Sequence, residues 1–496
     1  MGNKVLLIRP QNIYGYNNYP PLNLISIGSV LEAEGYQVKI VNCGLEKNFK
    51  ETIAKELDGV LFAGVSLLTS EVPNAYEILK YLRKNTKAPI IVGGPHCTLF
   101  PEQMADCQYV DYVVVGEGEK HILEIARIIK SGEKYKDKIF KKEILDIEKS
   151  TLPDYSIDSN IERFIGSYLT DKLSQFVKQP MRWLPYESSR GCPSLCTFCV
   201  NVVTGNTRYR KKSADKVLNE IGSITKKYRI SHLKIIDDNF FVDIERVRAI
   251  CEGMIARNLS ITWDAECRCD YFNNKIINDK TLKLLKAAGL VQLTLGIESG
   301  SQHSLDLMKK GITPKQAEFS VKKCNEYGIV ARSSFIMEVP GDKLDDIKQT
   351  IKLINRLRKY PFFTCGANTF RPYPKCELTQ QLIEDGLLAE PQDFESWIDK
   401  DIIESYSSAE YIMPWQANGV YSESAAWYIN MESTVRLGNY LMEKKSDKLK
   451  NNIFTLIARL RNRLLFYKFP FDKRMYQRFF TNFYNRRQRK EKSIYN

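Results

Sequence analysis

Short apolar runs alternate with amphipathic stretches over roughly the first 130 residues of the chain. Between the runs, residues 23–34 and 74–84 have apolar side chains three to four positions apart, which predicts helices with one buried face. Strands that alternate with such helices are typical of a parallel sheet covered by helices on both faces. We therefore expect a doubly wound, Rossmann-like α/β domain over residues 1–135, with strands at 5–8, 38–41, 59–66, 89–94 and 112–118.

A polar segment, residues 136–180, follows and is predicted to be a linker with some helix. After it the alternation resumes, with amphipathic stretches at 214–228, 244–257 and 281–288. Six strand–helix units of this kind favour a partial (β/α)6 barrel over residues 181–385. Its strands are predicted at residues 184–188, 232–237, 261–266, 291–298, 329–337 and 365–370.

Beyond residue 385 the strand pattern gives way to helical and aromatic sequence, so residues 386–496 are predicted to form a helical C-terminal region. One part of it has apolar residues at helical spacing with arginines between them: Ile453, Leu456, Ile457, Leu460 and Leu464. The chain ends in a basic run, residues 485–492.

Composition narrows the class of protein. The chain has 496 residues, of which 43% are hydrophobic and 12 are cysteines. It contains no run of about 18 uncharged apolar residues and no signal-peptide core at its start, so we expect a cytoplasmic protein. Thiols stay reduced there, which favours metal or redox use over disulfides. Six cysteines stand alone in sequence and are expected to be small buried side chains: Cys43, Cys97, Cys107, Cys251, Cys324 and Cys365.

Three further cysteines have the spacing of metal ligands. Cys192, Cys196 and Cys199 lie in the sequence SSRGCPSLCTFCV, directly after the first predicted barrel strand. Thiolates at this spacing favour an iron–sulfur cluster or zinc. A structural zinc ion needs a fourth ligand, and the histidine nearest in sequence is His232. Three thiolates instead suit a 4Fe-4S cluster that leaves one iron open to another molecule.

This motif, with Phe198 directly before the third cysteine, resembles that of the radical S-adenosylmethionine (SAM) superfamily. The resemblance extends over about residues 183–385. It implies that the open iron binds the amino and carboxylate groups of SAM, and that an electron from a flavodoxin- or ferredoxin-type donor then cleaves the sulfonium.

Later strand ends hold SAM in that superfamily; three positions here are similar, and a fourth departs from the family pattern. The GIESG sequence makes Glu298 an expected partner of the SAM amino or ribose groups, and Arg332 is expected to bind the SAM carboxylate. Gly341, in a VPG turn, would approach the adenine. Where relatives have Gly-Gly-Glu this chain has Asp-Asp-Asn, in which Asp238 would bond the methionyl ammonium. A YPGT turn of related enzymes is replaced by YPKC, so Cys376 is either inert or faces the substrate.

The N-terminal domain resembles the cobalamin-binding domains fused to many radical SAM proteins. In doubly wound folds the loops at the carboxyl ends of the strands form the ligand crevice, and glycines let a nucleotide tail approach the backbone. The resemblance therefore implies cobalamin contacts at a set of residues in such loops: Ser66, Thr69, Gly93, Gly94, Gly116 and Glu117.

One departure from that pattern concerns the cobalt. Cobalamin domains that ligate cobalt from below have Asp-x-His-x-x-Gly after the first strand, whereas the loop here, residues 9–21, contains no histidine. We therefore expect base-off cobalamin without a histidine ligand.

The resemblance implies a radical SAM enzyme that makes a 5'-deoxyadenosyl radical. The expected reaction is C-methylation of an unactivated carbon through methylcobalamin. The alternative is a non-methylating cyclase or rearrangement enzyme acting on a lipid, porphyrin or natural product. Two other classes fit less well. A methylthiotransferase needs a second cysteine triad, and Cys43, Cys97 and Cys107 are too scattered for one; a non-catalytic cobalamin or redox sensor would not need the SAM-binding positions.

The formal net charge of +14 suits anionic partners, but much of the excess lies in the C-terminal region. Aromatic residues alternate there with arginine and lysine. This pattern is compatible with packing against the barrel, with peripheral contact to an anionic membrane or, less favourably, with nucleic acid. The expected substrate is a small or lipid-like molecule, which the sequence does not identify.

Overall fold

A computed structural model describes residues 2–13, 19–133, 137–166, 181–407, 413, 415–441 and 445–479, without the side chains of 434–441. The last basic run, the aromatic residues from Phe480 onward and residues 14–18 of the loop expected to lie below the cobalt fall outside these residues.

The N-terminal domain is a six-stranded parallel sheet in the order β2-β1-β3-β4-β5-β6. The five predicted strands are confirmed. The strands are β1 (Lys4–Arg9), β2 (Gln37–Asn42), β3 (Val60–Ser66), β4 (Ile90–Gly93), β5 (Tyr112–Gly116) and β6 (Ile139–Glu143). The helices around the sheet are α1 (Leu22–Ala33), α2 (Phe49–Glu56), α3 (Val72–Asn85), α4 (Pro95–Leu99), α5 (Pro101–Asp106) and α6 (Glu119–Ser131).

The sixth strand lies in the segment that the sequence assigns to a linker. β6 pairs with β5 at the edge of the sheet, where only Phe140 of its five residues is buried. An edge strand that exposes Lys141 and Lys142 lacks the apolar run of a central strand. The short helix α7 (Ile161–Ile165) follows it.

The second domain is a six-stranded parallel sheet in the order β14-β13-β12-β11-β10-β7, which is the partial barrel that the sequence predicts. Its strands are β7 (Trp183–Tyr186), β10 (His232–Ile235), β11 (Thr262–Cys267), β12 (Leu290–Glu298), β13 (Val330–Met337) and β14 (Phe363–Thr369). A small hairpin, β8 (Ser189–Arg190) with β9 (Arg210–Lys211), follows β7. The helices are α8 (Val200–Val203), α9 (Ala214–Tyr228), α10 (Ile244–Ala256), α11 (Asp279–Ala287), α12 (Gln302–Leu307), α13 (Pro314–Glu326) and α14 (Leu344–Leu357).

Local sequence accounts for where several barrel helices begin. The Ser213 side chain accepts a hydrogen bond from the backbone N–H of Lys216 and so caps α9. Thr313 and Gln316 form a reciprocal capping box at the start of α13, and Pro314 occupies its first position. These caps fix where α9 and α13 begin, and so help to position the strand ends that these helices connect.

Side chains on the barrel strands alternate between two environments. On β13, Ala331, Ser333, Phe335 and Met337 are buried, whereas Arg332, Ser334 and Ile336 are half-buried or exposed. The buried set faces the covering helices, so the second set faces the concave interior of the barrel. Arg332 is thereby placed where a substrate or cofactor can reach it.

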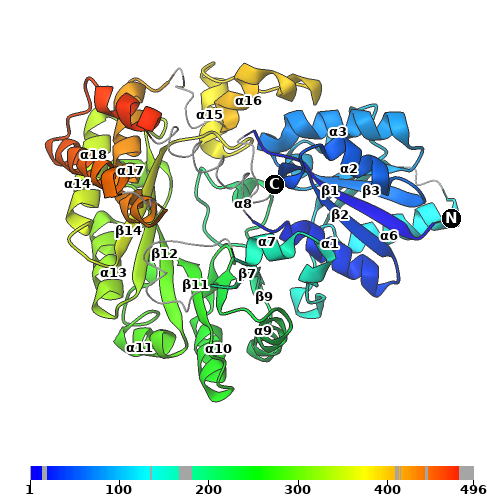
Figure 1. The fold of residues 1–496 in the computed structure, drawn as a ribbon, viewed down its shortest axis with the longest axis horizontal. Coiled ribbons are helices and arrows are strands. Elements are labelled where there is room, and N and C mark those ends of the chain that lie inside the picture. Colours follow the sequence, from blue (N-terminus) through cyan, green and yellow to red (C-terminus); the bar gives the residue numbers. More distant parts are fainter. Residues whose placement is uncertain are drawn as a thin grey trace.

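The C-terminal region lies against both domains (Figure 1). The segment with α15 (Glu377–Glu384) and α16 (Lys400–Ser407) reaches the N-terminal domain, where the Trp397 ring contacts the rings of His96 and Phe100. The long helices α17 (Gly419–Leu441) and α18 (Lys445–Leu464) lie beside β14, at the end of the barrel remote from that domain (Figure 1). None of the described helices combines the length and apolar composition that a bilayer-spanning segment requires.

Candidate functional site

The three-cysteine loop lies between the hairpin strand β8 and helix α8. It begins at Gly191, which has a φ of 88° and whose added Cβ would lie 2.4 Å from the carbonyl oxygen of Arg208. Only glycine fits that left-handed position and that close approach. The backbone N–H of the next residue, Cys192, donates to the carbonyl of Asn206 at 3.1 Å. The loop is therefore held against the strand that follows it.

Thr197, between the second and third cysteines, fixes the other side of the loop. Its backbone N–H donates to the carbonyl of Met308 at 3.1 Å, and its hydroxyl donates to the carbonyl of Leu307 at 2.9 Å. Its own carbonyl accepts from the N–H of Leu378 at 3.3 Å. The threonine thus joins the loop to the end of α12 and the start of α15.

The surroundings of the thiols are cationic on one side. Cys196 is buried, and burial raises the pKa of its thiol, while the charges of Lys310 and Arg268 oppose that rise. Burial also raises the pKa of Cys199. The amide of Asn239 points at the Cys192 sulfur at 3.6 Å and also donates to the Tyr271 hydroxyl at 2.9 Å. Positive charge and amide dipoles around three sulfurs suit an anionic iron–sulfur centre.

The two aspartates that precede Asn239, Asp237 and Asp238, bond different parts of the chain near the cysteine loop. Asp237 is buried and accepts hydrogen bonds from the backbone and hydroxyl of Ser188 and from the hydroxyl of Ser189. Asp238 accepts from the N–H of Gly191 at 2.9 Å and from the Asn206 amide at 3.1 Å. Asp238 therefore supports the start of the cysteine loop directly, in addition to any contact with SAM.

Glu298 lies at the end of β12 beside an irregularity in its pairing with β13. It has a φ of 61°, unusual for a residue other than glycine, and conformations of this kind cluster at functional sites. Its carboxylate accepts from the ammonium of Lys310 at 2.8 Å. Burial opposes the charge of Lys310, yet the neighbouring Glu298 and Cys196 raise its pKa. A fixed ion pair thus lies within reach of the cysteine loop.

Arg332 and Gly341, two of the residues expected to contact SAM, lie on β13 and in the turn that follows it. Arg332 faces the barrel interior, and within the described part of the chain its guanidinium makes no hydrogen bond or ion pair. Gly341 has a φ of 94° in a turn that Asp342 closes by accepting from the N–H of Val339 at 3.0 Å. The guanidinium is therefore available to a carboxylate ligand.

A cavity of about 390 Å³ lies between the N-terminal domain and the barrel. Ser66, Gly93, Gly94, Gly116 and Glu117 line it from the N-terminal domain, at the carboxyl ends of its strands, as the sequence predicts. The barrel contributes a second set of lining residues: Glu187, Arg190, Asn206, Ile236 and Asp238. Because Asp238 also bonds Gly191, the cavity adjoins the cysteine loop.

The predicted cobalamin contacts differ in how they lie at this glycine-lined crevice. Gly94 has a φ of 96°, and a Cβ there would lie 2.8 Å from the Ser66 hydroxyl oxygen, so glycine keeps this wall open. Ser66 accepts a hydrogen bond from the Asn23 amide at 2.7 Å. Thr69 does not line the cavity; its hydroxyl lies 3.2 Å from Nδ1 of the buried His96. The structure thus brings five of the six predicted cobalamin contacts together.

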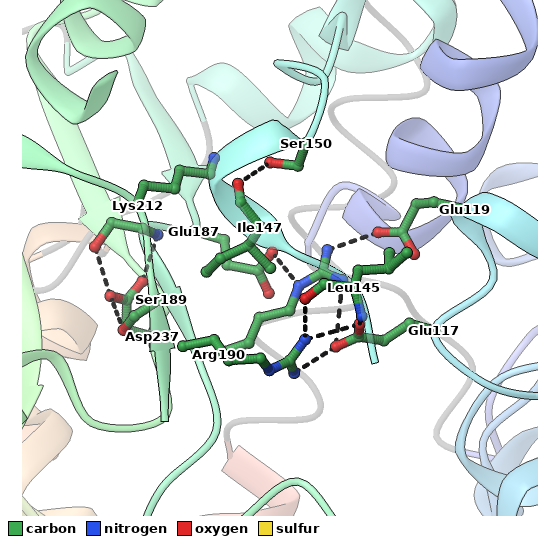
Figure 2. Close-up of polar contacts among 12 residues, drawn as sticks. Glu117, Glu119, Leu145, Ile147, Ser150, Glu187, Ser189, Arg190, Lys212 and Asp237 are labelled. Atoms are coloured by element: carbon green, nitrogen blue, oxygen red, sulfur yellow. Dashed lines mark hydrogen bonds and ion pairs between the residues drawn. The ribbon is translucent and has the colours of Figure 1, made fainter. Parts of the chain in front are cut away.

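Two arginines of the β8–β9 hairpin join the two domains. The Arg190 guanidinium pairs with Glu119 at 2.6 Å, Glu187 at 2.8 Å and Glu117 at 3.5 Å. Arg210 donates to both oxygens of Glu117, at 2.6 and 2.9 Å. Figure 2 shows Arg190 next to Glu117, Glu119 and Leu145 of the N-terminal domain. We call these five charged side chains, Arg190, Arg210, Glu117, Glu119 and Glu187, the hairpin clamp.

Two carboxylates of the hairpin clamp have pKa values shifted in opposite directions. Burial works against ionisation of Glu117, but the hydrogen bond from Arg210 and the charge of Arg190 lower its pKa. Burial raises the pKa of Glu187, and Arg190 opposes that rise. Since Arg190 directly precedes Gly191, the clamp ties the position of the cysteine loop to the wall of the cavity.

The remaining histidines and cysteines lie away from this cavity. All four histidines are in the described residues: His96 lies among aromatic rings, His121 contacts the Lys141 carbonyl, and His232 and His303 contact Asp264 and Asp346. The six isolated cysteines are buried, as expected. Cys376 is also buried, and burial raises the pKa of its thiol to about 12, which favours the inert alternative.

Comparison with protein families assigns both domains. Residues 13–126 match the B12 binding domain, and residues 186–354 match the radical SAM superfamily. The chain belongs to the cobalamin-dependent radical SAM enzymes. In this radical SAM enzyme the cysteine loop and the glycine-lined crevice therefore fall within the two family domains that the sequence indicates.

Known relatives of this radical SAM enzyme differ in activity. An uncharacterized methyltransferase of Pyrococcus horikoshii is 29% identical, over 78% of this chain and 84% of that protein. An anaerobic magnesium-protoporphyrin IX monomethyl ester cyclase of Rubrivivax gelatinosus is 24% identical, over 79% of this chain and 72% of that protein. The structure of the cobalamin-dependent SAM radical enzyme OxsB with aqua-cobalamin has the same fold, with a TM-score of 0.71 and 19% identity over 92% of this chain and 71% of that chain.

Several residues of the site escape prediction from sequence. Lys310 lies 12 positions after Glu298 in an ordinary KKG sequence, with no local pattern to link the two. Asn239 and Tyr271 come from different strand ends. Arg190 differs from these residues. The sequence itself shows an arginine two positions before Cys192 and an acidic GEGE sequence with which it could pair.

Proposed function

We propose that this radical SAM enzyme transfers a methyl group to an unactivated carbon of its substrate. A 4Fe-4S cluster with SAM would supply a 5'-deoxyadenosyl radical that takes a hydrogen atom from that carbon, and cobalamin would supply the methyl group. The observation that carries the proposal is the shared position of Asp238, which bonds the start of the cysteine loop and lines the cavity of the B12 binding domain.

The chain's own residues have distinct parts in this proposal. Cys192, Cys196 and Cys199 would hold the cluster, and Arg332 would grip the SAM carboxylate, since a guanidinium binds a carboxylate with two parallel hydrogen bonds. Glu298, held by Lys310 at 2.8 Å, would orient the amino or ribose groups. The cysteine loop is kept in place by Gly191 and Thr197, so that these groups meet a preorganised site.

The crevice residues suit the nucleotide tail of cobalamin. Its walls at Gly93, Gly94 and Gly116 have no side chains, and its volume of about 390 Å³ falls in the range typical of ligand pockets. Since each of the four histidines is engaged elsewhere, base-off cobalamin without a histidine ligand remains our proposal for the lower face of the cobalt.

A test that needs no knowledge of the substrate follows the methyl group of SAM. The holoenzyme, reconstituted anaerobically with iron, sulfide and cobalamin, is incubated with dithionite and SAM carrying a deuterated methyl group. We expect mass spectrometry to find both 5'-deoxyadenosine and trideuteriomethyl-cobalamin. Formation of 5'-deoxyadenosine while the cobalamin stays unmethylated would contradict methyl transfer.

That contrary result would favour the second candidate, a non-methylating cyclase or rearrangement enzyme. The second candidate is supported by the similarity to the magnesium-protoporphyrin IX monomethyl ester cyclase. That similarity covers about the same share of this chain as the similarity to the methyltransferase relative. We rank methyl transfer first because the methyltransferase relative is the more similar of the two, at 29% against 24% identity.

A further inference from the structure

Helix α18 has its polar and apolar faces reversed with respect to an ordinary surface helix. The residues that it buries are Asp447, Asn451, Thr455, Ala458, Arg461 and Asn462, only one of which is apolar. Its exposed face instead presents five large apolar side chains at intervals of three and four: Leu449, Ile453, Leu456, Leu460 and Leu464, with 50–66% of their surface exposed. We call these five residues the α18 stripe. A surface helix normally buries such a stripe.

The buried polar face of α18 is satisfied, so the orientation of the helix is well determined. The Arg461 guanidinium pairs with Asp472 at 2.6 Å and donates to the carbonyls of Phe466, Lys468 and Phe469. The amide of Asn462 donates to Glu432 at 3.0 Å. Turning the helix over to bury its leucines would break these bonds and leave charges without partners.

Apolar exposure continues past the end of the helix. Phe466, Phe469, Phe471 and Met475 are between 47% and 75% exposed. Together with the α18 stripe, which is about 22 Å long at 1.5 Å per residue, they form a contiguous stretch of sequence whose large side chains face solvent. Patches of this kind mark interaction sites.

Within residues 445–479 the exposed charges are all of one sign, and one of these cations, Arg459, pairs with Glu432 of α17 at 3.4 Å. Between residues 445 and 479 the only carboxylates are Asp447 and Asp472, and both are buried. The exposed cations of the same stretch are Lys445, Lys448, Lys450, Arg459, Arg463, Lys468, Arg474 and Arg478. An apolar stripe flanked by cations is complementary to a bilayer with anionic headgroups, in which leucines enter the acyl region and cations remain at the phosphates.

We propose that the α18 stripe lies in the interface of an anionic membrane and holds the enzyme there peripherally. The helix is at the end of the barrel remote from the N-terminal domain, so the cavity between the domains stays clear of the membrane (Figure 1). Nucleic acid would use the cations and could stack bases on the three exposed phenylalanines, but the five aliphatic side chains of the α18 stripe would gain little from it. A second copy of the chain would bring a like-charged surface against this one.

Vesicle binding tests the proposal on the full-length holoenzyme. We expect it to sediment with vesicles of phosphatidylglycerol and phosphatidylcholine, and much less with phosphatidylcholine alone. The double substitution Leu456→Ser and Leu460→Ser should weaken binding to the anionic vesicles at least about tenfold, by the transfer free energy of burying leucine. Lys448→Gln with Arg463→Gln should weaken it several-fold and reduce its sensitivity to salt.

Matched controls come from exposed residues elsewhere in the barrel and, for Lys80, on α3 of the N-terminal domain. Ile255 and Phe319 are 46% and 45% exposed, so Ile255→Ser with Phe319→Ser removes comparable apolar surface and should leave binding unchanged. Lys80→Gln with Lys226→Gln serves the same purpose for charge. All variants should keep the iron content and melting temperature of the parent protein, because every substituted side chain is exposed.

Either of two vesicle results would overturn the proposal: failure of the parent protein to bind anionic vesicles, or equal binding by the leucine variant. A dimer in sedimentation velocity that the leucine variant converts to a monomer would also overturn it, since the α18 stripe would then contact a second copy of the chain.

Discussion

Single residues decide whether the cysteine loop can hold a metal centre. Spacing alone identifies Cys192, Cys196 and Cys199, because ligands on one short loop are also neighbours in sequence. Lys310 and Asn239 come to the loop from other strand ends, and no periodicity reveals such meetings. Thr69 is a predicted cobalamin contact that the structure places away from the cavity: it follows β3, yet its hydroxyl lies 3.2 Å from Nδ1 of His96.

Gly191 is the residue whose replacement should damage the loop most selectively. In Gly191→Ala the new Cβ meets the Arg208 carbonyl at 2.4 Å and the φ of 88° is strained, so the loop must shift. We expect the iron content after anaerobic reconstitution to fall by more than about half. Gly222→Ala is the control, since no atom lies within 4 Å of its added Cβ. Helical alanine should stabilise that variant by about 0.5–1 kcal/mol and leave its iron content unchanged. Full iron content in Gly191→Ala would refute this role.

At the scale of elements, the positions of strands follow from sequence where a strand is buried on both faces. Runs such as residues 59–66 are apolar throughout and mark the centre of a parallel sheet. β6 exposes charged residues at the sheet edge and is missed for that reason. Helix α18 has a recognisable period, but the period does not tell which face is buried. That choice depends on Arg461 and Asp472, which are 11 residues apart.

The hairpin clamp should contribute measurably to the joining of the two domains. Arg190→Gln removes the cation that Glu117, Glu119 and Glu187 share, although Arg210 stays at Glu117. The Arg190 side chain is only 15% exposed. Breaking a buried pair from one side costs several kcal/mol, so we expect a loss of about 3 kcal/mol in urea unfolding. The control Lys50→Gln breaks the exposed pair with Glu77 and should cost less than about 0.5 kcal/mol. Equal losses in both variants would contradict the clamp.

The contact between α4 and the C-terminal region should make stability depend on pH. Burial lowers the pKa of His96 to about 3, below the value of about 6.5 for an exposed histidine. The stabilisation from neutral His96 is thus complete above about pH 6.5 and is lost as the pH falls from there towards 3. Between pH 7.0 and 5.5 the parent protein should lose about 1 kcal/mol more than His96→Gln in urea unfolding. Parallel pH curves for the two proteins would be inconsistent with a neutral buried His96.

At the scale of the whole molecule, two parallel sheets meet with their strand ends at a common cavity. The hairpin clamp, the cysteine loop and Asp238 all lie at that junction. The C-terminal region contacts the N-terminal domain through Trp397, and it presents the exposed α18 stripe at the far end of the barrel. The proposed site for SAM and cobalamin thus lies between the domains, and the far end of the barrel is left for contact with another surface.

The central claim is that the cysteine loop holds a cluster that cleaves SAM. It is tested most directly by measuring 5'-deoxyadenosine from anaerobically reconstituted protein with SAM and dithionite, in Cys196→Ala and in Cys324→Ala. Both cysteines are buried, but Cys324 lies on α13 away from the loop. We expect the parent and Cys324→Ala to form 5'-deoxyadenosine and Cys196→Ala to form none. Unchanged product from Cys196→Ala, or equal loss in both variants, would contradict the account.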